Sequence, residues 1–367
     1  MRLRKVYLAA GIMLFMISAL SINTTYPISM LRISTSAIIA TPTQPPLPSG
    51  TASMSFSFTP NILATQTPTM TPSRIPTSQL STKSVAPAKD ASKTTPVVIY
   101  AVGDIAECKG APLDQSNAAM TTSNLLLKTS GPIFTLGDNS NDAGTENDYK
   151  YCYNPSWGRL LERTYPVMGN HDVSADKQGT AYFSYFAGMT GVWGHYSLDL
   201  GAWHIIILNA ECEIGAQGCY YGSPQEKWLR ADLAATRQKC IIALWHQPLF
   251  TSGGQKSYLA VQSFWFDLYN YKADIILNGH NHMFERFVPL NPYGVAVADG
   301  LRQFVVGTGG AHLDTKIKSF AAGEVVRDAS SYGYLKLTLY SNSYQWQFVP
   351  SSSSSFKDMG SAFCHRS

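Results

Sequence analysis

The chain has 367 residues, which is enough for one catalytic domain of about 250 residues with a large buried core and a terminal extension. Only 14% of the residues are charged, the formal net charge is +4, and the basic residues form no run beyond Arg2, Arg4 and Lys5. This pattern argues against nucleic-acid binding driven by contacts to phosphates.

The N-terminus has the layout of an export signal, because three cations precede the apolar stretch Val6 to Leu20. We expect residues 1–23 to be a signal peptide, or an uncleaved N-terminal anchor that would give the only membrane contact. The chain is then secreted or otherwise extracytoplasmic. Residues 24–95 are rich in Thr, Ser and Pro without apolar periodicity, which predicts a disordered linker.

Strand-like apolar runs begin at Val97 and alternate with helix-like stretches, which predicts an α/β domain over residues 96–350. A Ser-rich C-terminal tail is expected at residues 351–367. The expected strands are 97–102, 133–136, 165–168, 204–208, 241–245 and 275–277, followed by a mostly antiparallel segment with strands at 304–306, 334–340 and 344–349. The expected helices are 117–128, 225–236 and 261–271.

Six cysteines, an even number in a chain with an export signal, favour disulfides over buried free thiols. The sequence does not fix their pairing. Cys212 with Cys219, which would close a Gly-containing loop, is the most favoured single pair. The other four are Cys108, Cys152, Cys240 and Cys364.

Polar residues recur just past the expected strand ends, where ligands collect in open α/β sheets. They are Asp104, Asp138, Asn170, His171, His246, His280 and His282. Carboxylate, amide and imidazole ligands without thiolate suit Fe, Zn or Mn, and this set is large enough for two ions that share a ligand. Two such ions activate a water and neutralise charge during displacement at phosphorus, which favours phosphoryl transfer.

Five blocks in order resemble the motifs of calcineurin-like metallophosphoesterases, and their spacing is similar to that of purple acid phosphatases and their bacterial relatives. The blocks are Gly103-Asp104, Gly137-Asp138-Asn139, Gly169-Asn170-His171-Asp172, His246-Gln247-Pro248 and Gly279-His280-Asn281-His282. The resemblance implies a four-layer α/β/β/α sandwich of two mixed sheets flanked by helices. A dinuclear metal site is expected at the C-terminal ends of the strands.

The resemblance also implies a role for each motif residue. Asp104 and His282 would bind the first ion and Asp138 would bridge the two. The second ion would be bound by Asn170, His246 and His280. A hydroxide that bridges the ions would attack phosphorus, while His171 assists the leaving group and Asp172 orients its imidazole.

Two departures from the family pattern affect the first ion. Purple acid phosphatases have a Tyr three residues after the bridging Asp, and here that residue is Asn141. Without a phenolate we expect a colourless protein. Many class members also have a His two residues after the first Asp, where this chain has Ala106. Either Asn141 or solvent would fill the gap.

The expected function is hydrolysis of a small phosphate monoester, with a phosphodiesterase and a non-catalytic extracellular binding module as alternatives. An ordinary polar turn or a Ca²⁺-binding loop is the alternative for residues 138–142, which lack the spaced Glu and Gly of such a loop. His195, His204, His312 and His365 are expected to be structural, although His312 follows a Gly-rich stretch and is the one of these closest to the expected pocket.

Overall fold

The computed structural model describes residues 95–109, 113–114, 116–314, 320–351 and 354–366, all within one compact unit. The predicted signal or anchor at residues 1–23, and all but the last residue of the predicted linker at 24–95, lie outside this range. Among the described residues, no helix combines the length and the apolar character needed to cross a membrane.

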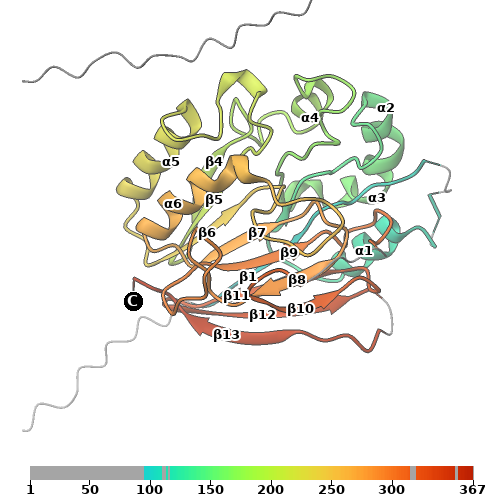
Figure 1. Cartoon of the computed structure of the whole chain (residues 1–367). Helices are drawn as coiled ribbons and strands as arrows, with labels where there is room; N and C mark the ends of the chain where they lie inside the picture. The colour runs from blue at the N-terminus through green and yellow to red at the C-terminus, as the bar shows by residue number, and fades with distance from the viewer. Residues whose placement is uncertain (1–94, 110–112, 115, 315–319, 352–353, 367) are drawn as a thin grey trace, which may run out of the picture. The chain divides into compact units, whose positions relative to one another are not determined.

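The first of two mixed sheets has the strand order β13-β12-β11-β1-β2-β3 (Figure 1). Parallel pairing joins β1 to β2 and β2 to β3, while β11, β12 and β13 extend the sheet as antiparallel strands. Their bounds are Val97–Val102 (β1), Ile133–Thr135 (β2), Thr164–Tyr165 (β3), Gly333–Leu339 (β11), Ser343–Pro350 (β12) and Met359–Phe363 (β13).

The second sheet has the order β10-β8-β9-β7-β6-β5-β4, with β5, β6, β7 and β9 parallel to one another. Strands β5, β6 and β7 are nearly continuous apolar runs because both of their faces are buried. The bounds are Tyr196–Leu200 (β4), Trp203–Ile207 (β5), Cys240–Leu244 (β6), Ile275–Asn278 (β7), Phe284–Phe287 (β8), Arg302–Val306 (β9) and Glu324–Asp328 (β10).

The longest helix, α5 (Pro224–Ala235), begins at Ser223, whose side chain accepts a hydrogen bond from the Glu226 amide, with Pro224 in the first turn. The other α-helices are α1 (Ala118–Leu126), α2 (Glu146–Asp148), α3 (Asn154–Ser156), α4 (Thr180–Tyr185) and α6 (Gln262–Asn270). A π-helical turn, η1 (Tyr149–Tyr153), and the 3₁₀ turns η2 (Gly158–Arg163), η3 (Ile214–Ala216) and η4 (Leu259–Val261) complete the helical elements of the described residues.

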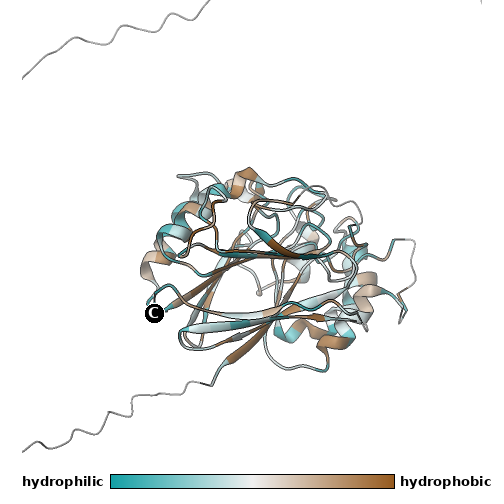
Figure 2. Cartoon of the chain, turned by 60° about the horizontal axis from the view of Figure 1, so that its bottom comes forward, coloured by the Kyte–Doolittle hydropathy of each residue, from teal (hydrophilic) through white to brown (hydrophobic). Residues whose placement is uncertain are grey.

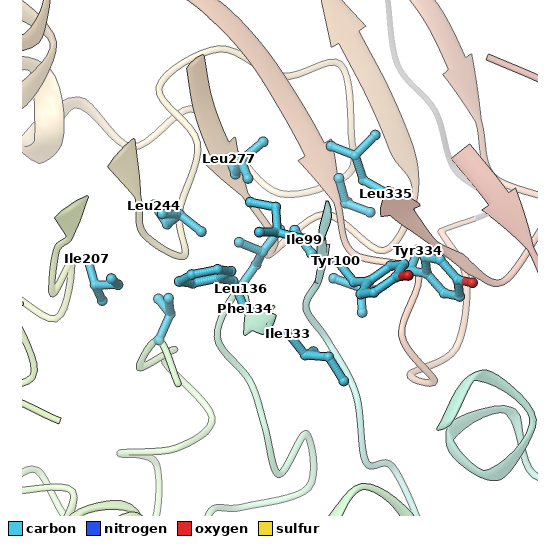
Figure 3. Close-up of a cluster of buried hydrophobic side chains, with 14 of the residues drawn as sticks. Ile99, Tyr100, Ile133, Phe134, Leu136, Ile207, Leu244, Leu277, Tyr334 and Leu335 are labelled. Atoms are coloured by element: carbon cyan, nitrogen blue, oxygen red, sulfur yellow. The ribbon is translucent and has the colours of Figure 1, made fainter. Parts of the chain in front are cut away.

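Two buried clusters hold the layers together, and alternate residues of β5 point into different ones. Ile205 and Ile207 pack against the first sheet, and Ile206 packs with residues of α5 and α6. Figure 3 shows part of the cluster between the sheets, where Ile99 lies among side chains of both. Figure 2 shows apolar strands running through the interior. The predicted α/β fold with two mixed sheets is confirmed.

The predicted C-terminal boundary at residue 350 is corrected by the structure. Strand β13 lies within the supposed tail and pairs in antiparallel register with β12, so the first sheet continues to Phe363. Cys364 then bonds to Cys240 at the start of β6. The sequence did not predict this strand because Met359–Phe363 is a short, largely exposed edge strand that follows the Ser-rich residues 351–355 and is ordered by its pairing with β12.

All six cysteines are paired, so the alternative of buried free thiols is wrong. The predicted Cys212–Cys219 pair is confirmed and closes a loop after β5. Cys108–Cys152 ties the loop after β1 to η1. These two crosslinks restrain loops that follow strand ends, where the candidate site lies.

Candidate metal centre

The predicted site residues follow the carboxyl ends of neighbouring strands in both sheets. Asp104 comes two residues after β1 and Asp138 three residues after β2, and these strands are parallel neighbours. Across the domain, His246 comes two residues after β6, and His280 two residues after β7. Stacking of the two sheets brings these strand ends together. Ligand atoms of Asp104, Asp138 and His246 all lie within 4.8 Å of one another.

Three of these residues have backbone conformations that favour glycine. The φ angles of Asp104, Asp138 and His280 are 58°, 50° and 73°, in the left-handed region. Such angles in residues with a side chain persist only where the surrounding structure enforces them, and they cluster at functional sites. Close packing enforces them here, since a Cβ atom on Gly169 would lie 2.3 Å from the Asp138 amide nitrogen.

Asp138 lies at the centre of one half of the site. Its Oδ2 is 3.2 Å from His246 Nε2, and its Oδ1 accepts a hydrogen bond from the His171 amide at 2.8 Å. Asn170 Oδ1 lies 3.1 Å from the same His246 nitrogen. Burial opposes the charged form of Asp138, but the charges of His246 and His171 outweigh it and lower the pKa of Asp138 to about 2.

Asp104 lies at the centre of the other half. Its Oδ2 accepts a hydrogen bond from the His280 amide at 2.8 Å, and its Oδ1 is 3.4 Å from His282 Nε2. Burial lowers the pKa of His282, but the Asp104 carboxylate outweighs this and raises it to about 9. The ring centroids of His246 and His280 are 5.0 Å apart, so the His246 half and the His280 half of the site are in contact. Burial, together with the charge of His246, lowers the pKa of His280 to about 4.

Two of the imidazoles are oriented by backbone carbonyls. His246 Nδ1 lies 2.7 Å from the Leu136 carbonyl oxygen, and His282 Nδ1 lies 2.7 Å from the His312 carbonyl oxygen. Each Nδ1 therefore donates a hydrogen bond, and each Nε2 faces an aspartate. Metal-binding histidines have this arrangement, because the outer hydrogen bond fixes the tautomer and the ring orientation.

The donor set fits a pair of metal ions. Asp104 Oδ1 is buried and accepts no hydrogen bond from any described residue, although a carboxylate oxygen without a partner is costly in the interior. The convergent atoms are carboxylate, amide and imidazole, which suit Fe, Zn or Mn. A second close group of Cys240, Asp274 and Cys364 offers no thiolate, because its cysteines form a disulfide.

Asp172 does not orient His171 as predicted. His171 Nδ1 lies 3.0 Å from the Asp142 carbonyl oxygen, which takes that position. The buried Asp172 carboxylate instead accepts hydrogen bonds from the backbone amides of Asn139, Ser140 and Gly169, from the Asn139 side chain and from the Tyr149 hydroxyl. Asp172 thus joins the loop after β2, the loop after β3 and η1.

This network predicts a structural role for Asp172. The Asp172→Asn substitution puts an NH₂ group against these donors, so we expect a loss of about 3 kcal/mol or more in the free energy of unfolding. Urea denaturation of the metal-free protein measures it, with the exposed Asp176→Asn as a control. A stability equal to that of the control would contradict the role.

The sequence analysis assigned no role to two pairs beside these residues. His312 was expected to be structural, but its ring lies 4.9 Å from that of His282 and its Nδ1 lies 3.0 Å from Glu107 Oε2. The Gly-rich stretch before His312 was the one sequence feature that placed His312 near the site.

The second pair is Gln247 and Glu211. Gln247 Nε2 donates to Glu211 Oε1 at 2.5 Å, next to His246. Glu211 also lines a cavity of about 210 Å³ with Val173, Lys177, Cys212, Glu213, Ile214 and Tyr258.

Aromatic side chains from the segments next to the site fill the core. Tyr149, Tyr153, Trp157, Tyr182 and Phe186 are almost fully buried and belong to the cluster between the sheets. Their hydroxyls and rings support the loops that carry the site, as the Tyr149 bond to Asp172 shows.

Comparison with known proteins places the motif-bearing region in one group. Residues 97–284, just over half of the chain, match the family described as Calcineurin-like phosphoesterase. Purple acid phosphatase 15 of Arabidopsis thaliana is 28% identical over 231 residues, which cover 50% of this chain and 42% of that protein. Phosphoenolpyruvate phosphatase of Allium cepa is 26% identical, with 64% and 56% covered. The chain spans about half the length of the curated relatives it matches.

Solved structures show the same fold. Purple acid phosphatase PPD1 from yellow lupin (Lupinus luteus) seeds superposes with a TM-score of 0.59 at 20% identity, covering 73% of this chain and 53% of that one. GAP50, the anchor in the inner membrane complex of Plasmodium, superposes with a TM-score of 0.56 at 15% identity, covering 73% and 89%. The fold shared with these two structures therefore covers more of the chain than residues 97–284, which match the family.

Proposed function

Because this chain belongs to the calcineurin-like phosphoesterase family, we propose that it hydrolyses small phosphate monoesters with the help of two bound metal ions. The observation that carries the proposal is the convergence of Asp104, Asp138 and His246 at the ends of strands from two different sheets. Relatives named as phosphatases support the choice of monoesters.

The ligands divide into two groups around Asp138. We assign Asp104 and His282 to the first ion, and Asn170, His246 and His280 to the second, with Asp138 shared. The short distances from Asp138 Oδ2 and Asn170 Oδ1 to His246 Nε2 support the second group. Fe, Zn or Mn would suit these donors.

When bound, the two ions supply an activated water and neutralise negative charge at the phosphoryl group. The protein's own contribution to the leaving group is His171. Its Nε2 lies 4.0 Å from Asp138 Oδ2, and its side chain is 37% exposed, so it borders the site and is open to substrate. The Asp142 carbonyl accepts a hydrogen bond from Nδ1, so the imidazolium form of His171 carries its second proton on Nε2 and gives that proton to the departing alkoxide, which leaves a neutral imidazole.

Two further parts of the proposal concern location and alternatives. We propose that the protein works outside the cytoplasm, and three disulfides support this because they persist in oxidising compartments. A phosphodiesterase shares the same metal chemistry, and a binding module would keep the fold without turnover. The following experiment separates the three functions.

We expect the purified full-length chain to hydrolyse an aryl phosphate monoester faster than the matching diester, and to lose this activity on chelation. Added Zn²⁺, Mn²⁺ or Fe²⁺ should restore turnover, since the ions supply the activated water and the positive charge that neutralises the phosphate. Release of the chromogenic phenol gives the rates. Faster diester hydrolysis would assign a phosphodiesterase instead, and no turnover with any of the three metals would favour the binding module.

A further inference from the structure

The first ion is one protein ligand short in the assignment above. The second ion has three ligands besides the shared Asp138, whereas the first has only Asp104 and His282. Ala106, which follows Asp104 in the same loop, is fully buried and has no donor atom in its side chain. A buried ion with few ligands requires another oxygen or nitrogen from a neighbouring loop.

Asn141 lies beside this gap. Its amide donates a hydrogen bond to the Ala106 carbonyl at 2.9 Å, and the Ala106 amide donates to the Asn139 carbonyl at 3.1 Å. Ala106 and Ser140 form a parallel β-bridge between the two loops. The loop of Asp138 therefore runs alongside the loop of Asp104, with Asn141 next to Ala106.

The Asn141 side chain has an oxygen without a partner. The residue is only 3% exposed, and its Oδ1 accepts no hydrogen bond from any residue that the structure describes. Asp104 Oδ1, on the adjoining loop, likewise accepts no hydrogen bond from the described residues, and it faces His282, whose Nε2 lies 3.4 Å away. Buried oxygens are nearly always satisfied in folded proteins, so two such atoms on adjoining loops indicate a bound cation.

Two neighbours of Asn141 provide a comparison. Asn139 Oδ1 and Ser140 Oγ are also buried without a partner. The Asn139 side chain, however, is fixed away from the gap by hydrogen bonds from its Nδ2 to Asp172 and to the Val167 carbonyl. Ser140 is adjacent to Asn141, is buried and forms the β-bridge with Ala106, so it serves as the matched control.

We propose that Asn141 binds the first ion through Oδ1, and that this ion is divalent. The inference rests on the two-metal centre of the proposed function. Asp104 and Asp138 are the only carboxylates among the ligands, and His282 and Asn141 are neutral. Two carboxylates balance half the charge of two divalent ions. A trivalent ion would add buried positive charge without a further anionic ligand.

The test measures metal content and affinity rather than activity. Metal-free full-length protein is titrated with Zn²⁺ alone by calorimetry, and the zinc-to-protein ratio is measured by mass spectrometry after desalting. We expect two zinc ions per chain in the unsubstituted protein and in Ser140→Ala. Asn141→Leu should keep one tight site, with affinity at the other reduced roughly 10- to 100-fold or more. Asn141→Asp should bind two.

Two results would overturn the proposal. One is an Asn141→Leu variant that binds both zinc ions as tightly as the unsubstituted chain. The other is an unsubstituted chain that takes one zinc ion and fills its second site only with ferric iron. If Asn141→Leu does not fold, Asn141→Ala is judged by the same criteria, with thermal melting of the metal-free proteins as the check on folding.

This test separates the ligand assignment from the proposed function. Two zinc ions in the unsubstituted chain and one tight site in Asn141→Leu support the assignment, even if no phosphate ester is hydrolysed. Chelator-sensitive hydrolysis together with unchanged zinc binding in Asn141→Leu overturns the assignment and leaves the function intact.

Discussion

The Asp138→Asn substitution should lower kcat/KM for a phosphate monoester by about 10³ or more, because it removes the charge that both metal ions are proposed to share. The pKa of Asp138 is lowered to about 2, so its carboxylate stays charged at neutral and mildly acidic pH. Its Oδ2 also lies 3.2 Å from His246 Nε2 and 4.0 Å from His171 Nε2. Steady-state kinetics with saturating metal, together with metal analysis of the purified variant, measure both effects.

Asp176→Asn is the control for this substitution. Asp176 is exposed and accepts hydrogen bonds from the amides of Gln178 and Thr180, outside the candidate site. It is expected to retain activity and metal content. An Asp138→Asn enzyme within a few-fold of the control, with both ions bound, would rule out the bridging role.

The His171→Ala variant should bind metal normally, but its kcat for an alkyl phosphate should fall by a factor of about 10² to 10⁴. His171 is not assigned to either ion, and its half-buried side chain makes few contacts that the fold needs. An alkoxide is a poor leaving group and depends on a proton donor, whereas a nitrophenolate departs without one. The loss with a nitrophenyl phosphate should therefore be much smaller.

This difference between substrates separates proton donation from other roles of His171. A residue that only bound the phosphate would slow both substrates equally. His365→Ala is the matched control, because His365 bonds the Ala273 carbonyl near the C-terminus and lies apart from the site residues in sequence and in contacts. Equal losses for both substrates in His171→Ala would contradict the role of acid.

Much of the fold followed from local patterns. The expected strand 97–102 matches β1, and the expected helices match α1, α5 and α6 within a few residues. Strands β5, β6 and β7 were visible because strands buried on both faces are continuous apolar runs. The strands without a prediction, β4, β8, β10 and β13, are edge strands or antiparallel partners with mixed composition, whose residues are ordered by pairing rather than by their own pattern.

The candidate site also has residues that the sequence predicted and contacts that it did not. Asp104, Asp138, His246 and His280 could be proposed from sequence because each follows a strand end and because their blocks occur in a characteristic order. The partners of those residues were not visible. The family resemblance implied that Asp172 contacts His171, yet the folded backbone turns its carboxylate toward Tyr149 and the Asn139 loop.

Residue order alone thus establishes the strand ends, the type of donor atoms and the family, since each depends on neighbours along the chain. The packed loops decide which atoms meet. Only the packing shows that the Asp142 carbonyl lies against His171 Nδ1, that Asn141 lies beside Ala106, and that Cys364, just after β13, is bonded to Cys240 at the start of β6. These contacts join segments far apart in the chain, and they form because stacking of the two sheets and close packing around Gly169 leave the loops few other arrangements.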